Sequence, residues 1–142
     1  MDCKFNGTVL DALKYNGNDL DSLKFNGTTV WQKGSPGVAA TLSLTLPYQT
    51  NLMVWAYFDN NGIYVGESYG LRVGDIVDNF NSAYGSQGYT ATYSGYTINI
   101  SSPQATGGDC NGKVFKVEYR SRFTGDPDAT YSAALTGGQN AY

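Results

Sequence analysis

The side chains that could carry chemistry in this chain are pairs of aspartates, two cysteines and many aromatic rings, because the sequence contains no histidine. Without an imidazole, neither a Ser-His-Asp nor a Cys-His nucleophilic site can be built, and histidine-based metal centres are excluded too. Most hydrolytic and metal-dependent enzyme classes are therefore hard to assemble from these residues.

Three pairs of aspartates are close in sequence: Asp19 with Asp21, Asp75 with Asp78, and Asp126 with Asp128. A general acid needs surroundings that raise its pKa, and nothing apolar enough flanks the first pair, so we interpret it as a solvated turn. Helix capping explains the second pair, and an Asx or proline turn explains the third better than calcium binding does. No glycine-rich nucleotide-binding motif is present. We expect no catalytic residues, no cofactor and no metal, and predict that the protein is not an enzyme.

The two cysteines, Cys3 and Cys110, leave two alternatives open. A disulfide forms if the N-terminal segment packs beside the loop that carries Cys110, whereas reducing cytoplasms favour two free thiols. We favour the free thiols.

Aromatic residues offer a different chemistry, because tyrosine and tryptophan rings on exposed strands can stack on sugars. Pairing across strands and contacts between subunits explain such rings equally well. A receptor- or carbohydrate-binding module, with a glycan or a host receptor as partner, is therefore the alternative function. The candidate rings are Tyr48, Trp55, Tyr57, Tyr64, Tyr69, Tyr84, Tyr89, Tyr93 and Tyr96.

Charge and hydropathy exclude two classes of partner. The net charge is −3 and the nine Lys and Arg residues are scattered, whereas a nucleic-acid surface needs them clustered. No window approaches the roughly 20 apolar residues that cross a bilayer. We expect no nucleic acid and no membrane as partner. Charged residues make up only 15% of the chain, which is typical of a protein covered by its neighbours.

A ten-residue repeat fills the first 33 residues: Lys-Phe-Asn-Gly starts at position 4, Lys-Tyr-Asn-Gly at 14 and Lys-Phe-Asn-Gly at 24. Asn-Gly suits a type I′ turn, so each copy predicts a short β-hairpin, with Phe5 facing Val9 and Phe25 facing Val30. The second copy could instead form a short helical turn or a loop.

A hairpin of this size is marginal in water by itself, so the repeat needs a further surface. That surface is either the rest of the same chain or, as we favour, a neighbouring subunit, to whose sheet edge a strand is added. The residues expected to dock there are Phe5, Tyr15, Phe25, Val30 and Trp31.

Gly34-Ser35-Pro36-Gly37 ends the repeat and divides a predicted docking arm, residues 1–33, from a main domain, residues 34–142. Alternating leucines predict a strand at 39–46, and helical spacing of apolar residues predicts one helix at 74–84. Along 113–123, Phe115, Val117 and Tyr119 should point inward, and Lys116, Glu118 and Arg120 outward. Hairpins are predicted at 52–65, turning at 59–62, and at 89–100, turning at Ser94-Gly95, with a last strand at 130–135. The fold class is therefore mainly β (α+β), an antiparallel β-sandwich with one short helix, or a helixless β-sandwich as the fallback.

The segment Leu23-Lys24-Phe25-Asn26-Gly27-Thr28-Thr29-Val30-Trp31-Gln32-Lys33 resembles strings that recur in tail, baseplate and other virion proteins of tailed bacteriophages. Residues 73–100 are similar to a helix-then-hairpin element of phage tail and sheath proteins, and 129–137 to the closing strand of tail-tube-type proteins. The resemblance implies a structural protein of the virion, assembled in the host cytoplasm, in a tail, baseplate, neck or capsid-associated position. Its implied partners are other virion proteins and copies of itself.

Overall fold

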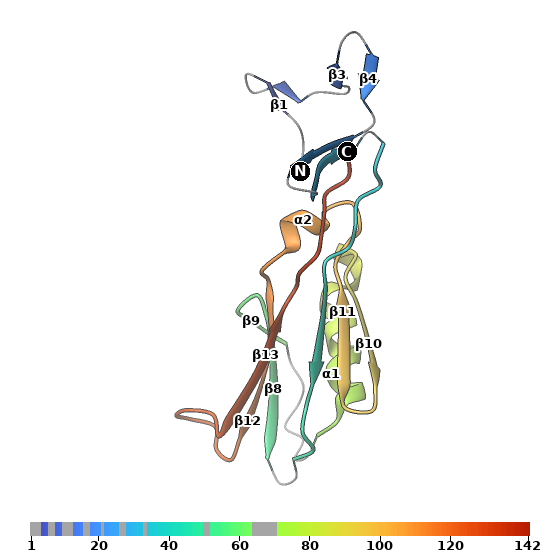
Figure 1. The fold of residues 1–142 in the computed structure, drawn as a ribbon. Coiled ribbons are helices and arrows are strands. Elements are labelled where there is room, and N and C mark those ends of the chain that lie inside the picture. Colours follow the sequence, from blue (N-terminus) through green and yellow to red (C-terminus); the bar gives the residue numbers. More distant parts are fainter. Residues whose placement is uncertain are drawn as a thin grey trace.

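In a computed structural model the chain forms two antiparallel sheets and a twelve-residue helix, preceded by short hairpins (Figure 1). The structure describes residues 4–5, 8–9, 13–15, 18–20, 22–25, 28–32, 34–49, 52–63 and 71–142, and before residue 34 it gives the backbone pairing of the strands. The mainly β, sandwich-like α+β class predicted from the sequence is confirmed.

The smaller sheet has the strand order β10-β11-β7 and consists of β7 (Thr41–Thr45), β10 (Thr90–Ser94) and β11 (Thr97–Ser101). Along β7 the two leucines are buried and the three hydroxyl residues that alternate with them are exposed, as the sequence pattern predicts. The hairpin of β10 and β11 is confirmed, but its turn is Gly95–Tyr96 rather than Ser94–Gly95, because Ser94 already pairs with Thr97. Gly95 has a φ of 58°, which suits the first central position of a type II′ turn.

The larger sheet has the order β13-β12-β8-β9 and consists of β8 (Met53–Phe58), β9 (Asn61–Ile63), β12 (Val114–Arg120) and β13 (Ala129–Ala134). The hairpin of β8 and β9 turns within two residues, Asp59 and Asn60, whose positive φ values of 50° and 65° fit a type I′ turn. The predicted turn at 59–62 was too long, since Asn61 already pairs with Phe58.

Helix α1 (Val73–Tyr84) closes one side of the sandwich, because it contacts β10 of the smaller sheet and β9 of the larger one (Figure 1). Its buried face includes Ile76 and Phe80, which are fully buried. The side-chain amide of Asn81 donates to the carbonyl of Ala91 at 2.9 Å and accepts from its N–H at 2.8 Å, so the outer edge of β10 is bonded to the helix. The 3₁₀ turn η1 (Gly85–Gln87) and the four-residue helix α2 (Gly107–Cys110) were not predicted.

The core between the layers contains a cluster of aromatic rings. Phe58 meets Phe80, Tyr84 and Tyr89 edge to face, with ring centroids 5.0–5.2 Å apart. Each such pair contributes about 0.5–1.5 kcal/mol beyond the burial of its area. The three inward residues predicted for β12 are fully buried, as expected.

The segment that leads into β7 pairs with the segment that follows β13, and this pairing joins the two sheets at one end. Val38 pairs with Gln139 and Thr41 with Thr136, and the Tyr142 N–H donates to the Ser35 carbonyl at 2.9 Å. Residues 35–41 therefore run antiparallel to residues 136–142, toward the C-terminus (Figure 1).

The repeat forms three hairpins, which confirms the hairpin interpretation for all copies, including the second. The pairs are β1 (Lys4–Phe5) with β2 (Thr8–Val9), β3 (Leu13–Tyr15) with β4 (Asn18–Leu20), and β5 (Ser22–Phe25) with β6 (Thr28–Gln32). In each, Asn-Gly lies between the paired ends. The expected partners were wrong, because Phe5 pairs with Thr8 and Phe25 with Thr28, not with Val9 and Val30.

Candidate docking site

Within the described residues, the acidic pairs do not gather into a chemical site. Asp75 is exposed, 3.9 Å from the Arg72 guanidinium, and α1 has no side-chain capping hydrogen bond, so the capping explanation is wrong. The Asp75 carboxylate lies in the first turn, where the helix dipole favours it. Asp128 is exposed and accepts a hydrogen bond from the Ser121 hydroxyl at 3.2 Å. Asp19 pairs with Lys14, and Asp21 lies outside the described residues.

Metal binding and membrane spanning find no support in the described part of the chain. Within it, no three Asp, Glu or Cys side chains lie close enough together to hold a metal ion. None of its helices is long and apolar enough to cross a membrane.

Cys110 is a free, buried thiol, and its Sγ lies 3.2 Å from the Tyr89 hydroxyl. Burial, followed by the hydrogen bond to Cys110, raises the pKa of Tyr89 well above its ordinary value. Cys3, the only other cysteine in the sequence, lies outside the described residues.

The aromatic candidates fall into three environments. Tyr89 is buried and Tyr84 packs partly buried against the core, so neither ring is available to a sugar. Tyr48, Tyr93 and Tyr96 are 46–58% exposed, and the rings of Tyr48 and Tyr96 lie 5.8 Å apart. The half-buried rings are Trp55 and Tyr57, whereas Tyr64 and Tyr69 lie outside the described residues. The carbohydrate-binding alternative therefore stays a prediction.

One buried charge was missed by the sequence pattern. Glu118 should have pointed into solvent, but its side chain is 7% exposed and lies 2.7 Å from the Arg120 guanidinium and 3.7 Å from the Lys116 ammonium. The Lys116 ammonium also stands 4.7 Å from the centre of the Tyr57 ring. Burial first, and then the Glu118 carboxylate, raise the pKa of Tyr57. On the outer face of the larger sheet, the Glu118 carboxylate is thus buried between the charged groups of Lys116 and Arg120.

The sandwich is left open on the side opposite α1, between the edge strands β7 and β13. Thr41 exchanges backbone hydrogen bonds of 2.9 and 3.0 Å with Thr136, and beyond this bridge the two strands diverge (Figure 1). Each of the two strands is therefore paired along one edge only within the described residues. We call the space between them the open seam.

Backbone polarity at the open seam follows from the bridge. Groups two residues apart in an antiparallel strand point to the same side, so the amides and carbonyls of Ser43 and Thr45 face the seam as those of Thr41 do. On β13 the Leu135 N–H donates to the Lys113 carbonyl at 2.9 Å, so the backbone groups of Leu135 point to β12. The groups of Ala134 and Ser132, which lie one and three positions earlier, therefore face the seam. In the described part of the chain these four residues have no backbone partner on that side.

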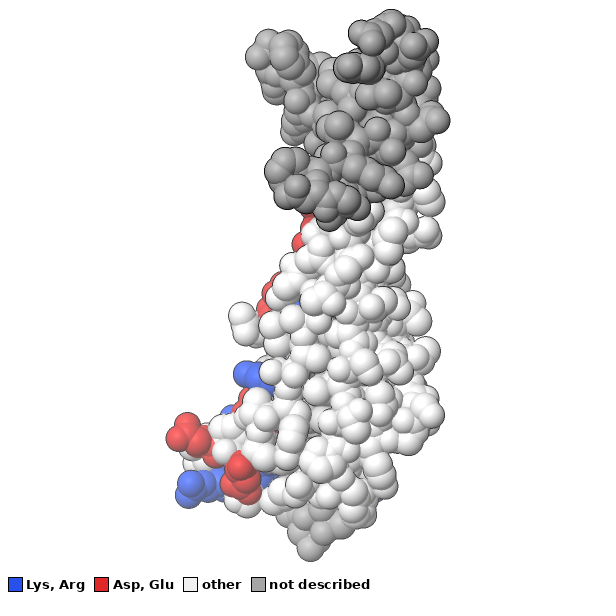
Figure 2. Space-filling model, viewed as in Figure 1, with Lys and Arg blue, Asp and Glu red and all other residues white. Residues whose placement is uncertain are grey.

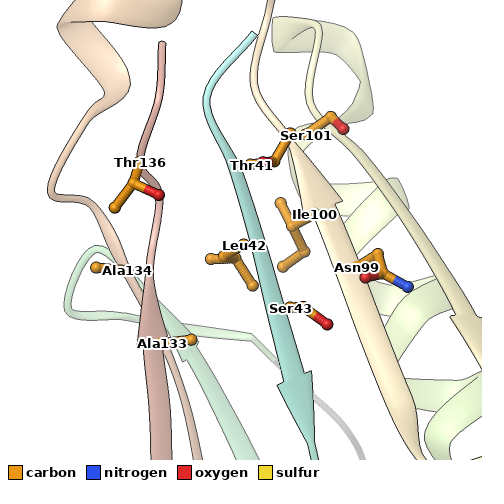
Figure 3. A pocket seen from close by; sticks show the side chains of 9 residues that line it. All are labelled: Thr41, Leu42, Ser43, Asn99, Ile100, Ser101, Ala133, Ala134 and Thr136. Atoms are coloured by element: carbon orange, nitrogen blue, oxygen red, sulfur yellow. The ribbon is translucent and has the colours of Figure 1, made fainter.

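A hollow of about 450 Å³ lies where the two strands fork (Figure 3). Its walls combine small side chains, such as Ser43 of β7 and Ala133 and Ala134 of β13, with the larger Leu42 and Ile100. The small side chains of Ala133 and Ala134 leave this hollow open beside β7.

The face over the open seam carries no charge. None of β7, β10 and β11 contains a charged residue, and in Figure 2 the coloured side chains lie along the left edge of this view, most of them at the lower left, near the loop between β12 and β13. A charged strand that docked here would bury its charge without a counter-charge, whereas an uncharged strand would not.

The five predicted docking residues lie in the arm hairpins: Phe5 in β1, Tyr15 in β3, Phe25 in β5, and Val30 and Trp31 in β6. Their side chains are outside the described part, so their docking role stays a prediction. Sequence reasoning missed the open seam, although the run of uncharged strands gave a signal for it. Comparisons with family models, with curated proteins and with solved structures each found no match to this chain.

Proposed function

We propose that this chain is a non-enzymatic structural subunit of a tailed-phage virion, tail or capsid associated, that assembles through strand and aromatic contacts with copies of itself and with other virion proteins. Residues 1–33 act as its docking arm and residues 34–142 as the main domain that receives neighbours. The sequence resemblance of the arm to virion proteins supports the virion setting.

The observation that carries the proposal is the isolation of the repeat hairpins. Each is a sheet of two strands, and none pairs with a strand of the two main sheets within the described residues. Two-stranded sheets are marginal in water, and they gain stability when a further strand or layer covers them. We therefore expect a neighbouring subunit to supply the further strand or layer that stabilises the three hairpins of the arm.

Light scattering on the full chain over a range of concentrations tests this proposal. We expect oligomers that dissociate on dilution, and closed rings or tubes under the electron microscope, as symmetric virion parts require. A variant with Phe5→Ser, Phe25→Ser and Trp31→Ser should dissociate at about tenfold higher concentration or more, because aromatic anchors dominate such contacts.

A matched control removes three rings from the surface of the main domain. Tyr48, Tyr93 and Phe123 are 58%, 53% and 60% exposed, and replacing them with serine should leave assembly unchanged. A wild-type chain that stays monomeric at every concentration contradicts the proposal, and so does an arm variant that assembles as well as the control.

A further inference from the structure

We propose that the open seam is the acceptor site for the β5–β6 hairpin of a second copy of this chain, with β6 added as a strand along the free edge of β7. The inference rests on the proposed function, in which the arm docks on a neighbour, and it names where the arm docks.

The acceptor edge is complete in backbone groups but lacks a partner strand. Ser43 and Thr45 present both N–H and C=O toward the seam, beyond the point where Thr41 is bonded to Thr136. The other outer edge of the same sheet is β10, which is bonded to Asn81 of α1. The edge of β7 is therefore the one open to strand addition in this sheet.

The donor strand is selected by length and charge. β6 has five residues, as many as β7, and Thr-Thr-Val-Trp-Gln carries no charge to match a seam face without charge. The remaining arm strands have two to four residues, and β1, β3, β4 and β5 each contain a Lys or an Asp. β6 therefore fits the seam better than the other strands do.

β6 has a free edge at Thr29, next to the β-bulge at Val30 that shifts its pairing with β5. Phe25 and Thr28 close a two-residue loop, which makes them a hydrogen-bonded pair, so the N–H and C=O of Thr29 point away from β5. Within the described residues β6 pairs with β5 alone. The Thr29 backbone groups can thus bond to the edge of β7.

The donor must come from a second copy because of the chain path. Residues 35–41 are tied to the C-terminal segment by the Ser35–Tyr142, Val38–Gln139 and Thr41–Thr136 pairings, and they lead away from the seam. For β6 to lie beside β7 of its own chain, the connection would have to fold back and break these pairings. A neighbouring copy can supply β6 without breaking any of them.

Two proline substitutions test the inference, because proline removes an N–H and is tolerated where that N–H faces away from the sheet. Ser43→Pro blocks the acceptor edge and leaves the donor intact, and Thr29→Pro blocks the donor edge and leaves the acceptor intact. We expect each variant alone to need about tenfold higher concentration, or more, to associate in light scattering. An equimolar mixture should regain association as one-way 1:1 heterodimers, in which the arm of the Ser43→Pro chain occupies the seam of the Thr29→Pro chain.

Ser43→Ala and Thr29→Val keep the amides and should associate as wild type does. Ala134→Trp fills the hollow from an exposed position of β13, and it replaces Ser43→Pro, alone and in the mixture, should that variant not fold. Wild-type association that persists in both proline variants overturns the inference and leaves the proposed function standing. A mixture that fails to associate also overturns it, whereas a wild-type chain that never associates removes the proposed function itself.

Discussion

At the scale of single residues, Glu118 shows how alternation along a strand can mislead. The pattern along β12 placed it on the outer face correctly, but that face is covered by its own neighbours. Glu118 is paired across the sheet with Trp55 on one side and Thr130 on the other, and Arg120 and Lys116 reach over it. A carboxylate buried in this way must stay paired.

Replacing Glu118 by glutamine should therefore lower the free energy of unfolding by about 2–3 kcal/mol, because the half-buried Arg120 loses its counter-charge. Urea denaturation at neutral pH measures the change. Asp75→Asn is the control, since this aspartate pairs with Arg72 at the surface, and its loss should cost less than about 0.5 kcal/mol. Equal effects of the two substitutions would contradict the buried ion pair.

At the scale of elements, the crossing of residues 35–41, α2 and residues 136–142 depends on close backbone approach. A Cβ at Gly107 would collide with the Val38 carbonyl oxygen, and a Cβ at Gly138 with the Gly107 carbonyl. Glycine lets these three segments meet, and their meeting joins the two sheets beside the open seam.

Gly107→Ala should lower the free energy of unfolding by about 2 kcal/mol or more, because backbone atoms must move apart to make room. Gly85→Ala is the matched control: at that position φ is −59° and no atom lies within 4 Å of the added Cβ. Gly85→Ala should raise the free energy of unfolding by up to about 1 kcal/mol, because alanine has fewer conformations than glycine in the unfolded chain. Thermal and urea unfolding measure the stability of both variants. Similar destabilisation of both would contradict the close packing of Gly107 against the Val38 carbonyl.

At the scale of the whole molecule, the sandwich is closed on one side and open on the other. Helix α1 bonds the edge of β10 and lies against β9, whereas β7 and β13 contact each other but are bridged in the described part only through Thr41 and Thr136. Unpaired strand edges can pair with the strands of another chain, which promotes aggregation of a free protein and allows specific assembly of a subunit.

Hydrogen exchange should reveal this asymmetry as an alternation along β7. The Leu44 amide, which points to β11 as the Leu46 amide does, should exchange slowly, and the amides of Ser43 and Thr45 should exchange fast in the unassembled chain. Assembly should slow both fast amides. Uniform protection along β7 of the monomer would contradict the open seam.

Local sequence patterns determined much of this fold. Asn-Gly fixed the three hairpin turns, the leucines of β7 fixed its buried face, and helical spacing fixed α1, because each of these depends on residues a few positions apart. Turn positions were less certain, as the shift to Gly95–Tyr96 shows, since register depends on the partner strand.

Only the tertiary structure decided which edges of the sheets remain open. The flanking of Glu118 by Trp55 and Thr130, the bonding of Asn81 to Ala91 and the bridge of Thr41 to Thr136 all join residues ten or more positions apart. No periodicity along the chain records such pairings, because they depend on how the two sheets meet in space. The sequence by itself predicted a docking arm, and the fold left the edges of β7 and β13 without a partner strand within the described residues.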